Sequence, residues 1–119
     1  LGFSREDRSE NLRRISEVAR ILNDSGLICV AAMVAPEAAI RQKAADLVGS
    51  DRFITVHLSA SDDVCQQRDN EGHYDDDRPD LNYEVPENAD LTIDTEKNDP
   101  ASVVQQIYAL LVQRGFVPE

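Results

Sequence analysis

The 119-residue chain carries 23 acidic and 12 basic side chains, which gives a formal net charge of −11. This charge opposes nonspecific binding to nucleic acid or to an anionic membrane surface. A hydrophobic content of 41% is ordinary for a globular protein, and the longest apolar run, Leu27–Ala35, is too short to span a bilayer. The two cysteines form no CxxC motif, so we interpret them as reduced thiols and expect a cytosolic, cytoplasmic protein.

The N-terminal region predicts a well-capped helix. Ser4 is an N-cap candidate, Asp7 follows three residues later as in a capping box, and Gly26 is suited to the C-terminal end. The predicted helix covers Arg5–Asp24. Its apolar stripe consists of Leu12, Ile15, Val18, Ala19 and Leu22.

A buried strand and a second helix are expected next. Leu27–Val34 is continuously apolar without alternation, which is typical of a strand covered on both faces in a parallel sheet. Pro36 suits the first position of a helix that ends at Gly49. The inward residues of that helix are predicted to be Ile40, Ala44, Leu47 and Val48.

The second half predicts further α/β structure. Phe53–Leu58 is a strand candidate, and Ser61 is suited to cap a third helix. Residues 69–90 lack periodicity over a length that indicates either a functional or a disordered segment. Leu91–Asp94 predicts a short strand. A last helix is expected from Pro100 to Gly115, with Val103, Val104, Ile107, Leu110 and Leu111 facing the core.

This order predicts an α/β fold with a three-layer parallel sheet. Three strands can hardly cover helices in both outer layers, and no strand precedes the first helix. We therefore expect residues 1–119 to form a single partial domain that lacks an N-terminal β-α unit. An apolar seam left exposed beside the missing unit would favour a homo-oligomer.

Polar residues at the start of the first helix form the main candidate site. Arg8 and Asn11 are three positions apart, hence on one helix face, and Phe3 lies just upstream. A guanidinium beside a carboxamide suits a planar, anionic, nucleotide-like ligand. An ordinary amphipathic helix with surface polar residues is the alternative for any isolated pair of this kind.

Other motifs are weak or absent. The five glycines are Gly2, Gly26, Gly49, Gly72 and Gly115, and none fits a GxxxxGK[ST] phosphate-binding loop. Asp75, Asp76 and Asp77 are adjacent, unlike the alternating ligands of a calcium loop, so we expect a solvated acidic loop and no metal site. His57 is interpreted as a packed core histidine, and His73 as a weak ligand candidate.

Residues 1–14, LGFSREDRSENLRR, closely resemble the LGFS-x-x-DR-x-EN-x-RR segment of adenylylsulfate (APS) kinases. The resemblance implies that Phe3 stacks on the adenine of adenylylsulfate while Arg8 and Asn11 hold its polar parts. Residues 65–74 are similar to the family's C-x-x-RD-x-KGLY motif, which implies that Arg68 packs over the adenine of ATP. Residues 69–90 then correspond to the lid, and residues 83–88 match the family's YE-x-PE-N.

Several positions depart from the family pattern. The family's ISPYR-x-DR is eroded here, with Ala35, Ala38 and Ile40 in place of Ser, Arg and Asp. Glu37 adds a negative charge that should weaken anion binding, and Glu71 replaces a lysine. The K-A-R-A-G-E and F-T-G elements of the lid are absent.

The resemblance implies a P-loop nucleoside-kinase-like fold and transfer of the ATP γ-phosphoryl group to the 3′-hydroxyl of adenylylsulfate, giving PAPS. ATP and Mg²⁺ are implied in the same way, as is an ATP sulfurylase domain as a fusion partner. The alternative is a degenerate, non-catalytic domain that binds a nucleotide for regulation or assembly. Without a phosphate-binding loop, these 119 residues alone are predicted to be inactive.

Overall fold

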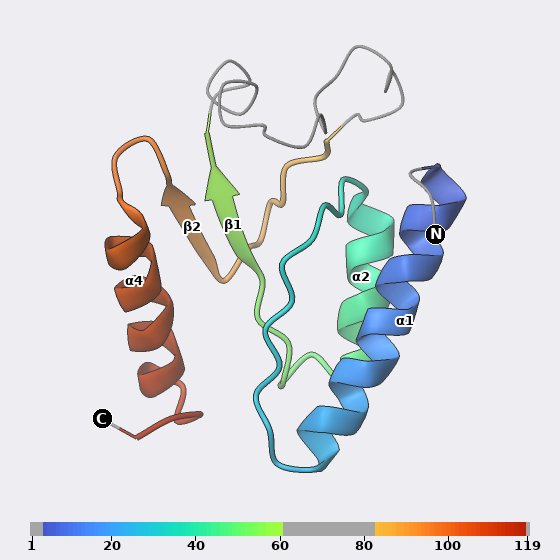
Figure 1. The fold of residues 1–119 in the computed structure, drawn as a ribbon, viewed down its shortest axis with the longest axis horizontal. Coiled ribbons are helices and arrows are strands. Elements are labelled where there is room, and N and C mark those ends of the chain that lie inside the picture. The colour runs from blue at the N-terminus through green and yellow to red at the C-terminus, as the bar shows by residue number, and fades with distance from the viewer. Residues whose placement is uncertain (1–3, 61–82, 119) are drawn as a thin grey trace. The chain divides into compact units, whose positions relative to one another are not determined.

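The computed structural model describes residues 4–60 and 83–118, and the chain divides into two compact units. The first unit comprises residues 1–53 and 76–86, and the second comprises residues 54–75 and 87–119. Figure 1 shows the elements in chain order. These are α1 (Arg5–Asp24), α2 (Ala38–Val48), β1 (Val56–Ser59), β2 (Leu91–Asp94) and α4 (Pro100–Gln113).

Helix α1 has the predicted limits because its ends are encoded locally. The Ser4 hydroxyl accepts a hydrogen bond from the Asp7 N–H at 3.1 Å, and Glu6 and Asp7 place negative charge in the first turn. Gly26 follows the helix with a φ of 88°, which glycine adopts without a Cβ penalty. The predicted helix Arg5–Asp24 is therefore confirmed.

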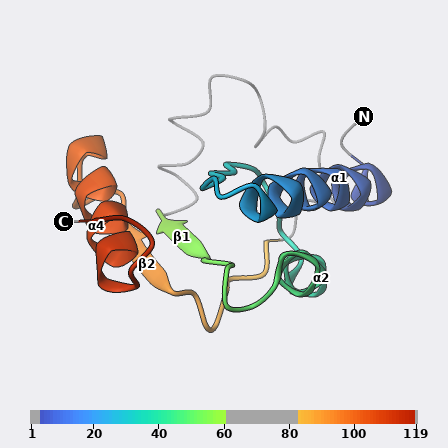
Figure 2. The same cartoon turned by 90° about the horizontal axis from the view of Figure 1, so that it is seen from below.

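Helix α1 packs against α2 within the first unit. The buried residues are Leu12 and Ser16 on α1 and Ala44 and Val48 on α2, and the Ser16 hydroxyl donates to the Leu12 carbonyl at 2.8 Å. Figure 1 and Figure 2 both show α1 and α2 side by side. The predicted inward position of Val18 is wrong, since this side chain is 54% exposed.

The segment between these helices differs from the prediction. Residues 27–37 have no regular secondary structure, so the predicted strand Leu27–Val34 is wrong for this structure. A strand covered on both faces requires backbone partners on neighbouring strands. The sheet of the described residues contains β1 and β2 alone, and Val30 in the apolar run is 87% exposed.

Helix α2 begins two residues later than expected. Pro36 precedes the helix, Glu37 is the N-cap with an extended backbone, and Ala38 is the first helical residue. Gly49 ends α2 as predicted, with a φ of 110°. Of the predicted inward residues, Ala44 and Val48 are buried, while Ile40 and Leu47 are half-buried.

The second unit contains a parallel pair of strands. Val56 of β1 is opposite Leu91 of β2, and the register continues to the pair Ser59 and Asp94. β2 has its predicted limits, whereas β1 starts three residues after the predicted Phe53. Ile93 is 1% exposed at the centre of this unit. The parallel pairing confirms the predicted α/β class.

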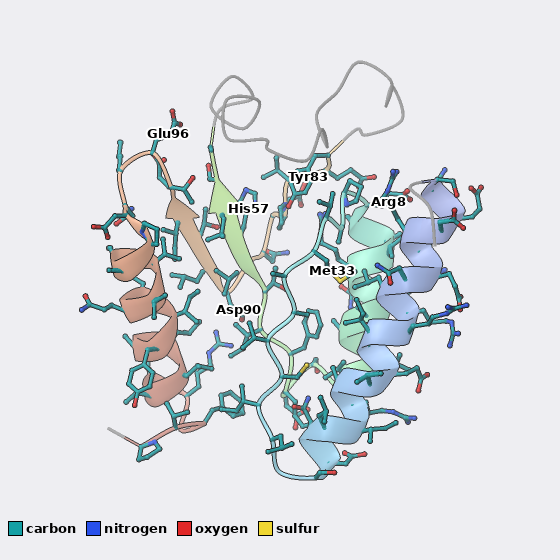
Figure 3. All side chains as sticks on the ribbon, in the orientation of Figure 1. Arg8, Met33, His57, Tyr83, Asp90 and Glu96 are labelled. Carbon is teal, nitrogen blue, oxygen red and sulfur yellow. The ribbon has the colours of Figure 1, made fainter. Side chains whose placement is uncertain are left out.

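Asp90 connects the beginnings of both strands to the end of α4. One of its carboxylate oxygens accepts the Thr55 N–H at 2.7 Å, and the other lies 2.9 Å from a guanidinium nitrogen of Arg114. Asp90 is labelled in Figure 3 at the base of the strands. This carboxylate joins three parts of the second unit.

Helix α4 begins at Pro100 as predicted. The Asp99 carboxylate caps the helix by accepting the Ser102 N–H at 2.8 Å, and Gly115 follows the helix with a φ of 78°. The predicted core position of Val104 is wrong, because that side chain is 64% exposed. The helix expected from Ser61 lies outside the described residues. None of the described helices has the length and apolar character needed to cross a membrane.

Candidate functional site

A hollow in the first unit lies where α1 and α2 begin. Its empty space is about 220 Å³, including its open mouth. Because this space includes open solvent, the hollow is shallow and encloses no nucleotide-sized cavity. The lining residues are Arg5, Arg8, Ser9, Leu12, Val34, Ala35, Pro36, Glu37 and Ile40.

Two arginines and one carboxylate set the charge of this hollow. Arg5 Nε donates to Glu37 Oε2 at 2.9 Å, which joins the first turn of α1 to the N-cap of α2. The Arg5 side chain is 71% exposed and that of Glu37 is 17% exposed. Arg8 is half-buried beside them. Glu37 pairs with Arg5, and the lining residues include two cationic side chains and one anionic side chain.

The predicted site residues differ in where the structure places them. The structure places Arg8 in the wall of the hollow, near the beginning of α1 (Figure 3). Asn11 is exposed on α1 and is not among the lining residues. Phe3 and Arg68 lie outside the described residues. The assignment of these four residues to ligands therefore remains a prediction.

Arg13 and Arg14 belong to a separate cluster on the surface of α1. Arg13 donates to both carboxylate oxygens of Glu10, at 2.9 and 2.6 Å, and Arg14 Nε donates to one of them at 3.1 Å. The hydrogen bonds from Arg13 and then Arg14 lower the pKa of Glu10 from the ordinary value of 4.5 to about 2. The same contact raises the pKa of Arg13. Neither arginine lines the hollow.

Sequence reasoning missed a cluster next to the hollow that is centred on Arg41. This guanidinium donates to the Ala35 carbonyl and to the Glu84 carbonyl, both at 2.6 Å. It also lies over the Tyr83 ring, 5.5 Å from the ring centroid. Figure 3 shows Tyr83 at the end of the first unit where α2 begins.

Glu84 makes two further contacts in the same cluster. Its backbone N–H donates to the Pro36 carbonyl at 2.7 Å, and its carboxylate accepts the Ala38 N–H at 3.2 Å. The signal available in the sequence was the retention of Arg41 and of the Tyr83-Glu84 pair from the family motifs. Neither motif indicates that residues 43 positions apart would meet.

The described residues do not fit a metal centre. In residues 4–60 and 83–118, no group of three or more histidine, cysteine, aspartate or glutamate side chains could hold an ion. Cys29 is a half-buried free thiol, and His57 is half-buried on β1.

A family model described as adenylylsulphate kinase matches residues 1–94. The chain belongs to the adenylylsulfate kinase family. The match includes Arg8, Asn11, Arg41 and Glu84, together with Phe3 and Arg68. It confirms the resemblance of this chain to adenylylsulfate kinases.

Individual relatives match almost the whole chain. The chain is 43% identical to a bifunctional enzyme CysN/CysC from Rhodopirellula baltica, over 98% of this chain and 20% of the relative. It is 39% identical to an adenylyl-sulfate kinase from Shewanella amazonensis, over 99% of this chain and 64% of the relative. The chain thus spans less than two thirds of either of these two relatives.

A solved structure supports the fold. The chain is similar to the hexameric APS kinase from Thiobacillus denitrificans, with a TM-score of 0.72 and 29% identity, over 98% of this chain and 20% of that chain. The described helices and parallel strands therefore belong to the fold of an adenylylsulfate kinase.

Proposed function

We propose that this chain forms the adenylylsulfate-binding side of an adenylylsulfate kinase. The observation that carries the proposal is the half-buried Arg8 in a hollow where two helices begin. Helix N-termini and arginine side chains both favour anionic groups. Family membership supports adenylylsulfate as the molecule that supplies the anion.

In this proposal, the residues bind and orient the acceptor nucleotide. Arg8 holds an anionic group of adenylylsulfate, Asn11 supplies a carboxamide near it, and Phe3 stacks on the adenine. Arg68 packs over the adenine of ATP, and residues 69–90 form the lid. The reaction of the whole protein is then transfer of the ATP γ-phosphoryl group to the 3′-hydroxyl, which depends on positioning and electrostatic stabilisation.

Association and location are part of the same proposal. The bifunctional relative supports a fusion to a second enzyme, for which ATP sulfurylase is the expected partner. The hexameric structure supports a homo-oligomer. The half-buried free thiol of Cys29 is consistent with a cytoplasmic protein.

A non-catalytic nucleotide-binding domain is the second candidate. Glu37 favours it, because this residue places a carboxylate in the hollow and neutralises Arg5. Ala35 and Ala38 contribute no polar group where the family pattern has serine and arginine. This candidate retains adenylylsulfate binding without phosphoryl transfer.

Substitution of Arg8 tests the proposed binding site. Loss of a hydrogen bond to a charged group costs about 1.5–3 kcal/mol, so Arg8→Ala should weaken adenylylsulfate binding by about tenfold or more in isothermal titration calorimetry. Arg14→Ala is the matched control, since Arg14 contacts Glu10 on the surface of the same helix. It should retain the wild-type affinity.

The proposal fails if Arg8→Ala and the wild-type chain bind adenylylsulfate equally. It also fails if neither the wild-type chain nor any variant binds. Circular dichroism of both variants separates loss of the site from loss of the helix.

A further inference from the structure

Residues that do not line the hollow make hydrogen bonds to the backbone of its wall. Val34, Ala35, Pro36 and Glu37 form one side of the hollow, although this segment has no helix or strand. Backbone groups outside regular structure need other hydrogen-bond partners. For this segment, Arg41 binds the Ala35 carbonyl and the Glu84 N–H binds the Pro36 carbonyl.

The Arg41 guanidinium is well suited to this bridging role. Its two terminal nitrogens reach carbonyls from two parts of the chain, Ala35 and Glu84, each at 2.6 Å. The fixed planar arrangement of its donors permits both bonds at once, and a charged donor strengthens each. The Tyr83 ring, 5.5 Å from the guanidinium carbon, holds the same group from one face.

Glu84 replaces a local helix cap. Glu37 is the N-cap of α2 but makes no capping hydrogen bond, because its carboxylate pairs with Arg5 in the hollow. The Glu84 carboxylate instead accepts the Ala38 N–H from 46 positions away. Because Glu84 caps α2, the Glu37 side chain is not needed as the cap and lies in the hollow.

We propose that Arg41 and Glu84 are positioning residues, which hold the wall formed by residues 34–37 in the geometry that binds adenylylsulfate. Neither side chain lines the hollow, so both act through the backbone of Ala35, Pro36 and Ala38. This inference rests on the proposed function for the identity of the ligand. The geometry of the cluster can be tested without the ligand.

Conservative and disruptive variants of Glu84 give the main test. Glu84→Gln keeps an oxygen that can accept the Ala38 N–H, whereas Glu84→Ala removes it. Loss of this ordinary hydrogen bond should make Glu84→Ala bind adenylylsulfate about fivefold more weakly in calorimetry, while Glu84→Gln keeps the wild-type affinity. Arg41→Lys should also weaken binding, because one ammonium group cannot bridge both carbonyls in the same way.

A variant of the second unit controls for general destabilisation. Asp99→Ala removes the carboxylate that caps α4, so it should lower the melting temperature while leaving the affinity for adenylylsulfate unchanged. Affinity that fell equally in Asp99→Ala and Glu84→Ala would refute a specific positioning role.

Amide hydrogen exchange at Ala38 provides the ligand-free measurement. Exchange should be faster in Glu84→Ala than in the wild-type chain, and Glu84→Gln should restore the slow rate. Equal exchange rates in Glu84→Ala and wild type would contradict the hydrogen bond between the Glu84 carboxylate and the Ala38 N–H. Faster exchange with unchanged adenylylsulfate affinity would overturn its positioning role, whereas absence of binding to the wild-type chain would overturn the proposed function.

Discussion

The Glu37 carboxylate lies where an anionic ligand group would compete with it for Arg5. The pair has an Nε–Oε2 distance of 2.9 Å, but 71% of the Arg5 side chain is exposed. The Glu37 side chain is only 17% exposed, so the Arg5 end of the pair is the one that a ligand anion can reach. We therefore expect Glu37 to weaken the binding of an anionic ligand.

Glu37→Gln should tighten binding of adenylylsulfate. Removal of the negative charge releases Arg5 and ends repulsion of the ligand, which should lower the dissociation constant by roughly threefold to tenfold at low salt. Calorimetry at two ionic strengths would show the gain shrinking as salt rises. Glu17→Gln is the control, since Glu17 pairs with Arg20 on α1 at 3.1 Å. Unchanged or weaker binding by Glu37→Gln would contradict this role.

Individual side chains differed in how far the sequence could predict them. A local motif and helical spacing predict Arg8 as a site residue, and the structure places it in the wall of the hollow, while its contact with a ligand stays a prediction. Arg41 and Glu84 were not assigned a role, because their contact joins positions 43 apart. Hydrophobic periodicity predicts the helix face on which an arginine lies. It does not predict which distant carbonyl accepts a hydrogen bond from that arginine.

At the scale of the helix, the Glu10 cluster makes the stability of α1 depend on pH. Its pKa falls from 4.5 to about 2 because Arg13 and Arg14 bind the ionised carboxylate. A carboxyl group with a lowered pKa stabilises the folded state above its unfolded pKa. That contribution is lost as the pH decreases from about 4.5 to about 2.

The expected result is a difference between wild type and Glu10→Gln that depends on pH. The variant should be less stable than wild type at pH 7, and the two should converge as the pH approaches the lowered pKa of about 2. Thermal unfolding followed by circular dichroism measures both proteins across this range. A difference that stays constant down to the lowest pH would show that the ionised carboxylate is not its source.

The elements that sequence predicted best have locally encoded ends. The side chains of Ser4 and Asp99 each accept a hydrogen bond from the backbone N–H three residues later, so α1 and α4 begin where expected. The predicted start of α2 was wrong, because the residue that caps this helix, Glu84, is distant in the sequence. The strand expected at 27–34 was wrong because apolar composition does not provide a pairing partner. Local signals thus predict helix limits better than long-range pairing.

At the scale of the whole molecule, binding and turnover are separable. None of the five glycines lies in a GxxxxGK[ST] loop, so these 119 residues should yield no measurable PAPS from ATP and adenylylsulfate. A coupled assay would test this, with the adenylyl-sulfate kinase of Shewanella amazonensis as the positive control. Turnover by the chain would contradict the prediction. Adenylylsulfate binding without turnover agrees with it.

The pairing of β1 with β2 has a consequence for the order of folding. It requires Thr55 and Asp90, 35 positions apart, to come together before the ladder can form. Closing such a loop costs chain entropy in advance of any hydrogen bond gained, whereas the turns of α1 close between near neighbours. The parallel ladder is therefore expected to form late on the refolding pathway and to set its rate.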